Sequence, residues 1–140
     1  MKILRPFHLA FPVTDLEITK HWYINNLGCT IGRFSEEWVD FNLYGHQIVA
    51  HLVDSMPIKL QSNEVDSKSV PPMHVGLILT PYQWKKLVIR LNDKDIEYII
   101  KPYTRFKGEP GEQHTFFIKD PSGNYLEFKS FEYDKNIFKK

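Results

Sequence analysis

FHLAFPV at Phe7–Val13 and MHVGLIL at Met73–Leu79 are the two stretches that decide the fold, because they repeat one pattern. In each, apolar residues alternate along the chain, and a histidine, His8 or His74, stands between the first two of them. Successive residues of a β-strand point to opposite faces of a sheet, so each histidine is expected on the face away from the main apolar set. The two histidines are 66 residues apart. We interpret the repeat as two related modules.

The same succession of elements is expected after each of these strands. Thr14 or Asp15 is a suitable N-cap for a first helix, and Gly28 is a natural stop for it. Pro81 is suited to the first turn of a second helix. Each copy is therefore predicted to be a βαβββ unit. The expected later strands are residues 30–34, 38–43 and 46–53 in the first copy, and 97–101, 114–119 and 124–128 in the second.

A polar stretch separates the two units, and an insertion lengthens the second. The stretch is rich in serine and proline, which favours a linker or a long loop. The insertion is YTRFKGEPGEQ at Tyr103–Gln113. We expect one α+β domain over the whole chain. Its parts are module one at about residues 1–54, a linker at about 55–72, module two at about 73–131 and a C-terminal tail at 132–140.

The composition is that of an ordinary globular protein and argues against two classes of partner. With 18 basic and 17 acidic residues the net charge is +1, so the basic footprint of a nucleic-acid binder is missing. No stretch approaches the ~20 apolar residues of a membrane span. The single cysteine, Cys29, cannot form an internal disulfide. We expect a cytoplasmic protein that binds neither nucleic acid nor membrane.

His8, His74 and Glu127 are the candidate metal ligands. Taken singly, each is more often a packing residue or an exposed strand residue. A small residue, Ala10 or Gly76, follows each histidine by two positions and leaves space beside the imidazole. If the first strands of the two copies lie side by side, two imidazoles and one carboxylate form a facial triad. Such a triad holds a divalent metal and leaves positions open for a substrate with neighbouring oxygens.

His51 is the candidate for a fourth role. It lies in the late strand of the first copy, two positions past the strict repeat of Glu127, which falls on Val49. It could be a fourth metal ligand, a general base near the metal, or a residue that orients a ligand. We expect His51 or Glu127 to assist proton movement in catalysis.

Four stretches of the sequence resemble the vicinal oxygen chelate superfamily, and together they extend over nearly the whole chain. They are FHLAFPV, HWYINNLG, MHVGL and DPSGNYLEF. The last is the most specific, because it is similar to the D-P-x-G-x-x-x-E ending of metal-dependent members. The superfamily includes glyoxalase I, fosfomycin-resistance transferases, extradiol dioxygenases and bleomycin-resistance binding proteins. The resemblance implies paired βαβββ modules whose curved mixed sheet cups a metal and a substrate.

The resemblance also implies which residues take part. By position, the metal ligands become His8, His74 and Glu127, with the fourth slot near His51. Glyoxalase I is expected to have a glutamate in the last strand of its first module, where this chain has Val49 and His51. The ligand set is therefore closer to fosfomycin transferases and extradiol dioxygenases. Similar proteins commonly build the site at a dimer interface, so we expect a homodimer, with modules paired within one chain or swapped between two.

The insertion supplies candidate substrate contacts. One interpretation is that it forms only the tip of a surface hairpin, because EPGE at residues 109–112 is typical of a tight turn. Against that, it places cations beside the proposed site, where such residues commonly hold anionic substrate groups. We expect a lid that contacts the substrate through Tyr103, Arg105, Lys107 and Gln113.

Three functions remain open at this point. The leading hypothesis is a metal-dependent lyase or dioxygenase that acts on a small oxygen-rich molecule chelated to Fe, Zn, Mn or Ni. The second is a metal-free protein of the bleomycin-resistance type that sequesters a small molecule in the same trough. The third is an interaction domain without a ligand, in which the two histidines are coincidental.

Overall fold

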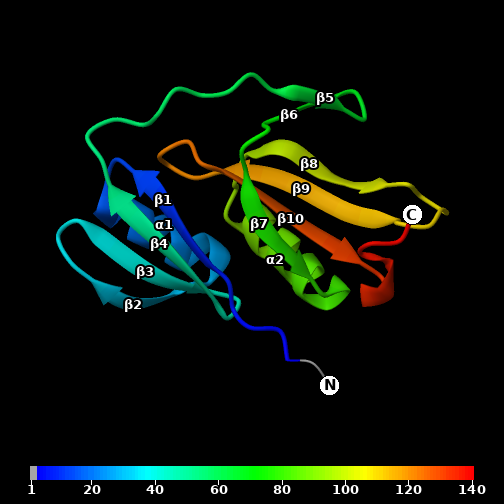
Figure 1. The fold of residues 1–140 in the computed structure, drawn as a ribbon, viewed down its shortest axis with the longest axis horizontal. Coiled ribbons are helices and arrows are strands. Elements are labelled where there is room, and N and C mark those ends of the chain that lie inside the picture. The colour runs from blue at the N-terminus through cyan, green and yellow to red at the C-terminus, as the bar shows by residue number, and fades with distance from the viewer. Residues whose placement is uncertain (1–2) are drawn as a thin grey trace. The chain divides into compact units, whose positions relative to one another are not determined.

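Two βαβββ modules follow one another along the chain, which confirms the predicted α+β fold (Figure 1). The computed structural model describes residues 3–140. Module one consists of β1 (His8–Val13), α1 (Leu16–Leu27), β2 (Thr30–Phe34), β3 (Trp38–Leu43) and β4 (His46–Leu52). Module two consists of β7 (Val75–Leu79), α2 (Pro81–Asp93), β8 (Tyr98–Arg105), β9 (Gln113–Lys119) and β10 (Tyr125–Phe131).

Each module forms its own four-stranded mixed sheet, with the strand order β1-β4-β3-β2 in module one and β7-β10-β9-β8 in module two. The first and last strands of a module are parallel neighbours, and the remaining pairs are antiparallel. Parallel neighbours need a long crossover connection, and the helix and two hairpin strands between them provide it.

Both helices begin where the sequence predicts, and α1 also ends at the predicted residue. The Asp15 carboxylate accepts a hydrogen bond from the Ile18 amide at 2.9 Å, and α1 ends at Gly28, whose φ of 72° is left-handed. Helix α2 begins at Pro81 behind a capping box, in which Thr80 and Gln83 bond to one another's backbone amides.

The core of each module lies between its helix and one face of its sheet. Helix α1 packs against β2, β3 and β4, and α2 packs against β7 and β10. The alternating residues of the first strands line this face, as expected for a strand with one buried side. The most deeply buried side chains are Val13, Tyr23, Val39, Phe41, Leu43 and Ile48 in module one, and Leu87, Leu91, Phe116, Ile118, Leu126 and Phe128 in module two.

The described residues form two compact units. Unit 1 is residues 3–58 together with the turn 120–122, and unit 2 is residues 59–119 together with 123–140. Within unit 1, the fully buried Tyr23 hydroxyl donates a hydrogen bond of 2.9 Å to Asp120. Burial, and then the neighbouring Asp120 carboxylate, raise the pKa of Tyr23. The aspartate of the DPSG turn is therefore a partner of a core tyrosine as well as a turn residue.

Two regions differ from the sequence expectation. The stretch expected as a linker contains a short hairpin, β5 (Asn63–Val65) and β6 (Lys68–Val70). Strands β8 and β10 run further than predicted, so Tyr103 and Arg105 belong to the sheet rather than to a loop. They pair with Thr115 and Gln113 of β9. The polar side chains of this segment do not show the apolar alternation that predicts a strand. Its backbone nevertheless continues the hydrogen bonding with β9.

The space expected beside His74 is filled. Gly76 of β7 lies opposite Glu127 of β10, and a Cβ atom added at Gly76 would stand 1.5 Å from the Glu127 carbonyl oxygen. The glycine therefore permits close approach of two backbones and does not leave a gap for a ligand. The equivalent residue of module one, Ala10, lies opposite Val49 and keeps its methyl group.

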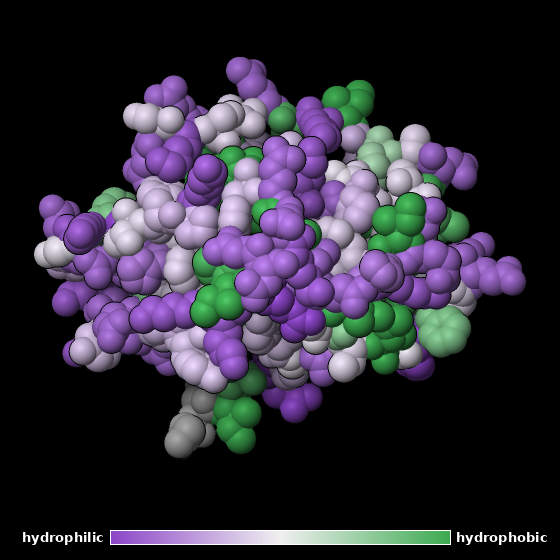
Figure 2. Space-filling view, turned by 180° about the vertical axis from the view of Figure 1, so that it is seen from behind, coloured by the Kyte–Doolittle hydropathy of each residue, from purple (hydrophilic) through white to green (hydrophobic). Residues whose placement is uncertain are grey.

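Within residues 3–140, no helix is long and apolar enough to cross a membrane. Figure 2 shows a face that is mostly hydrophilic, with hydrophobic side chains in separate small groups.

Substitution of Gly76 by alanine is expected to destabilise the protein by about 3 kcal/mol or more, because the clash is with backbone and no rotamer relieves it. Urea denaturation of the variant measures the loss. Ile78→Ala, on the same strand at a position 49% exposed, is the matched control and should cost far less. Equal losses for the two variants would contradict the close approach.

Candidate metal centre

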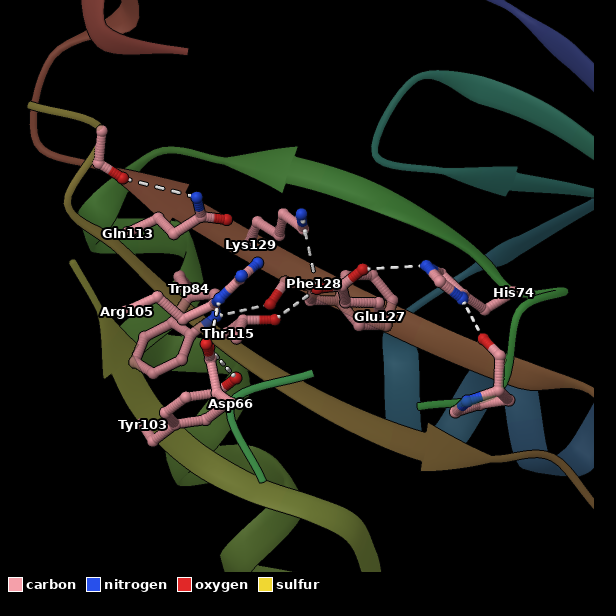
Figure 3. A network of polar contacts seen from close by, with 12 residues as sticks. Asp66, His74, Trp84, Tyr103, Arg105, Gln113, Thr115, Glu127, Phe128 and Lys129 are labelled. Carbon is pink, nitrogen blue, oxygen red and sulfur yellow. Dashed lines mark hydrogen bonds and ion pairs between the residues drawn. The ribbon is translucent and has the colours of Figure 1, made fainter. Parts of the chain in front are cut away.

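His74 and Glu127 meet on the face of the unit 2 sheet that points away from α2. Parallel pairing of β7 with β10 sets Gly76 opposite Glu127, and His74 lies two residues before Gly76, just ahead of the strand. The His74 Nε2 atom is 3.0 Å from the Glu127 Oε2 atom (Figure 3). The pair thus depends on strand register, although 53 residues separate its members in the chain.

The other nitrogen of His74 is also fixed. Its Nδ1 atom lies 2.6 Å from the carbonyl oxygen of Pro71, to which it donates, and its ring stands edge-on to Phe117 at 5.0 Å. The hydrogen bond to Glu127 raises the pKa of His74, and the bond to Pro71 adds to the rise against the opposing effect of burial. Without a metal, both nitrogens therefore face acceptors and favour the imidazolium.

Glu127 is held from both of its oxygens. Its side chain is 10% exposed, and Oε1 accepts a hydrogen bond from the Thr115 hydroxyl at 2.7 Å. The Lys129 ammonium lies 3.6 Å from the same oxygen. Burial raises the pKa of Glu127, but the hydrogen bonds from His74 and Thr115, together with Lys129, outweigh it and lower the pKa overall.

The donor atoms of this pair fit a divalent metal. Nitrogen and oxygen ligands at ~2.1 Å from one ion and at right angles lie about 3 Å apart, which matches the distance between His74 Nε2 and Glu127 Oε2. A metal-binding histidine usually donates its second N–H to a backbone carbonyl or carboxylate, as His74 does to Pro71. A metal would replace the proton that the pair now shares.

The other two expected ligands, His8 and His51, belong to unit 1. His8 is exposed on β1 opposite Gln47, and His51 is exposed on β4 opposite Pro12. The register separates the two histidines by four positions, or about 13 Å along the strands. Within residues 3–140, no three histidine, cysteine, aspartate or glutamate side chains gather into a metal-holding group.

The register also places Val49, not His51, at the counterpart of Glu127. Val49 lies opposite Ala10 in module one as Glu127 lies opposite Gly76 in module two. Only the second module has a carboxylate at this position. His51 lies two residues after Val49 and therefore on the same face of β4, because alternate strand residues share a face.

Two of the residues expected to contact the substrate, Arg105 and Tyr103, form hydrogen bonds to the hairpin β5–β6. Arg105 Nε and the Tyr103 hydroxyl both donate to Oδ2 of Asp66, which occupies the hairpin turn (Figure 3). The hydrogen bond from Arg105 is the main cause of a lowered pKa at Asp66, and Tyr103 contributes further. Lys107 is exposed in the turn between β8 and β9. Gln113 is buried, and its Oε1 atom has no hydrogen-bond partner within residues 3–140.

Sequence reasoning missed three partners of these residues. Thr115 had a signal, because it alternates with Phe117 on the strand that pairs with Glu127. The Pro71 carbonyl and the Asp66 carboxylate had none, because both lie in the segment expected as a linker.

The two mixed sheets, each with one helix on one face, define the vicinal oxygen chelate class of fold. The chain belongs to the Glyoxalase/Bleomycin resistance protein/Dioxygenase superfamily, whose family model matches residues 5–128. A glyoxalase/bleomycin resistance protein/dioxygenase from Alicyclobacillus acidocaldarius has a similar structure, with a TM-score of 0.79 and 31% identity. The similarity covers 95% of this chain and 96% of that one.

More distant structures share the fold alone. One is a mutant of the fosfomycin resistance protein FosX from Listeria monocytogenes, complexed with Mn(II) and 1S,2S-dihydroxypropylphosphonic acid. It is 15% identical, with a TM-score of 0.69 over 98% of each chain. Another is a virulence protein from Salmonella typhimurium, which is 23% identical, with a TM-score of 0.61 over 94% of this chain and 98% of that one. No curated protein gave a significant match.

The pair His74–Glu127 is expected to make the metal-free protein most stable at mildly acidic pH. A raised histidine pKa contributes stability that is complete below the ordinary value of 6.5 and is lost as pH rises through the raised pKa. A lowered glutamate pKa contributes stability that is present above 4.5 and is lost as pH falls through the lowered pKa. Urea denaturation from pH 4 to 9 should therefore show the wild type's advantage over Glu127→Gln greatest between these two values. A constant difference would contradict the pair.

Proposed function

We propose that the protein is a metal-dependent enzyme that acts on a small oxygen-rich substrate, by lyase or dioxygenase chemistry. The observation that carries the proposal is the His74–Glu127 pair, whose donor spacing and Pro71 anchor suit a divalent ion. His8 is proposed as the third ligand. The Mn(II) in the FosX structure supports a metal in this fold, and Fe, Zn, Mn and Ni are all candidates here.

The bound ion would supply Lewis-acid stabilisation of negative charge on the substrate oxygens. Within the chain, Thr115 and Lys129 hold Glu127 through Oε1, and Oε2, which now faces His74, would be the atom that coordinates the ion or accepts a proton. His51 is proposed to move protons rather than to coordinate. The register places it about 13 Å along the strands from His8, which is far for two ligands of one ion.

An anionic group on the substrate is proposed to bind Arg105 and Tyr103, with Lys107 and Gln113 nearby in sequence. Arg105 and Tyr103 already bind a carboxylate, that of Asp66, so their geometry suits an oxyanion. The FosX structure contains a phosphonic acid, which supports an anionic substrate for this fold. A substrate would have to displace Asp66.

One observation favours a second candidate, a metal-free binding protein. His74 has an acceptor for each nitrogen, so the His74–Glu127 pair is complete as an ion pair without a metal. A protein of this kind would hold a small molecule without turnover. We propose a homodimer for either function, and light scattering of the purified protein tests it.

Metal analysis separates the two candidates. Protein purified without added metal is expected to carry about one divalent ion per site, and His74→Ala or Glu127→Ala should lower the affinity by more than about 100-fold, because even residues that only orient a ligand cost 10–100-fold. Titration of the metal-free protein with Mn²⁺ or Zn²⁺ by calorimetry measures the loss. His21→Ala, at an exposed position of α1, is the matched control. Full metal content in both site variants would overturn the metal centre.

Replacement of Asp66 by asparagine is expected to strengthen anion binding by about two- to fivefold, because the carboxylate that competes for Arg105 is lost and an exposed ion pair contributes only modestly. Inorganic phosphate is the probe, and a calorimetric titration gives its affinity. Glu64→Gln removes the same charge from the same hairpin and is the control. Equal strengthening in both variants would show a general charge effect and not competition for Arg105.

A further inference from the structure

His8 is the end of a chain of hydrogen bonds across three strands of unit 1. Its Nδ1 atom is 2.7 Å from Oε1 of Gln47, which lies directly opposite it on β4. The amide nitrogen of Gln47 donates to Oδ2 of Asp40 on β3, at 3.3 Å. The Asp40 side chain is only 12% exposed. All three side chains lie on the face of the sheet away from α1, because they alternate with the core residues.

Elementary chemistry sets the direction of each bond in this chain. A carboxylate can only accept, so the amide NH₂ group of Gln47 must face Asp40. The amide oxygen of Gln47 then faces His8, and an amide oxygen can also only accept. His8 must therefore donate from Nδ1. In the neutral imidazole the proton is then on Nδ1, and the lone pair is on Nε2.

We propose that Asp40 and Gln47 are positioning residues that hold neutral His8 in the Nδ1–H tautomer and so present its Nε2 lone pair to a divalent metal. The role of the metal rests on the proposed function, whereas the tautomer is a property of unit 1 by itself. His74 of unit 2 has the same arrangement by another route, since its Nδ1 atom donates to the Pro71 carbonyl. Metal-binding histidines are commonly oriented in this way through their second nitrogen.

The surroundings of Asp40 suit this role. Gly32 of β2 lies beside it, and a Cβ atom added at Gly32 would be 3.3 Å from the Asp40 Cβ, so the glycine leaves the carboxylate its place. Arg33 Nε lies 3.9 Å from Oδ2, beyond hydrogen-bond distance, and so does not displace Gln47.

Isosteric substitutions test the chain directly. In Asp40→Asn the amide at 40 can donate as well as accept, so Gln47 is no longer held with its NH₂ group towards residue 40, and the population of the Nε2–H tautomer should rise. In the double variant Asp40→Asn with Gln47→Glu, the amide donates to the new carboxylate, which again accepts from His8, and Nδ1–H should return. The readout is the ¹⁵N spectrum of metal-free, histidine-labelled protein at about pH 9, where imidazoles are neutral. His8→Ala assigns the signal.

Two further variants keep the test decisive. Gln47→Leu changes an exposed position, removes the acceptor, and should also give Nε2–H even if Asp40→Asn fails to fold. Arg33→Gln is the control and should leave Nδ1–H unchanged. Wild-type protein in the Nε2–H form, or a double variant that does not restore Nδ1–H, overturns the assigned role of Asp40 and Gln47.

Metal affinity distinguishes this inference from the proposed function. Mn²⁺ titration should show a loss of about 10–100-fold for Asp40→Asn and recovery in the double variant. If the tautomers change as expected but Mn²⁺ affinity does not, and His8→Ala is also without effect, then His8 is not a ligand, and its part in the proposed metal site fails while the tautomer control stands. If His8→Ala weakens Mn²⁺ binding while Asp40→Asn leaves the tautomer unchanged, the assigned role of Asp40 and Gln47 fails and the proposed function stands.

Discussion

The parallel pairing of the first and last strands of each module is the constraint on which the structure depends. It sets residues 53 apart in the chain, His74 and Glu127, at 3.0 Å from one another. Close approach at Gly76, where no Cβ fits, holds β7 against β10 at this point. The same pairing in module one sets His8 opposite Gln47. The helix of each module makes the parallel arrangement possible, and its apolar packing stabilises the sheet from the face opposite the polar residues.

Much of this could be predicted from the sequence because strand periodicity and helix caps are local signals. The alternation around His8 and His74 gives the face on which each lies, and Asp15, Gly28 and Pro81 mark helix ends through their own backbone preferences. The repeat turns these local signals into a prediction of the whole fold. It also suggests Glu127 as a partner for His74, because one lies in the last strand of the module and the other at its first strand, which are neighbours in the sheet.

The remaining features depend on contacts between segments that carry no local pattern. Asp66 binds Arg105 and Tyr103 from a hairpin whose composition is typical of a linker. The Pro71 carbonyl that orients His74 is a backbone group, and a residue type cannot reveal it. Gly76 illustrates a related error: its small size suggests space for a ligand, yet the space is taken by backbone of the neighbouring strand. Residue size alone does not distinguish these two uses of glycine.

The two modules repeat their backbone but differ in how they orient a histidine. In module two a backbone carbonyl accepts from His74 Nδ1, and the carboxylate of Glu127 faces Nε2. In module one the side-chain amide oxygen of Gln47 lies 2.7 Å from His8 Nδ1, and the residue at the counterpart of Glu127 is Val49. A valine side chain can neither accept a hydrogen bond nor bind a metal, so Val49 cannot pair with His8 as Glu127 pairs with His74. The duplicated fold thus gives a carboxylate to the imidazole of module two and none to the imidazole of module one.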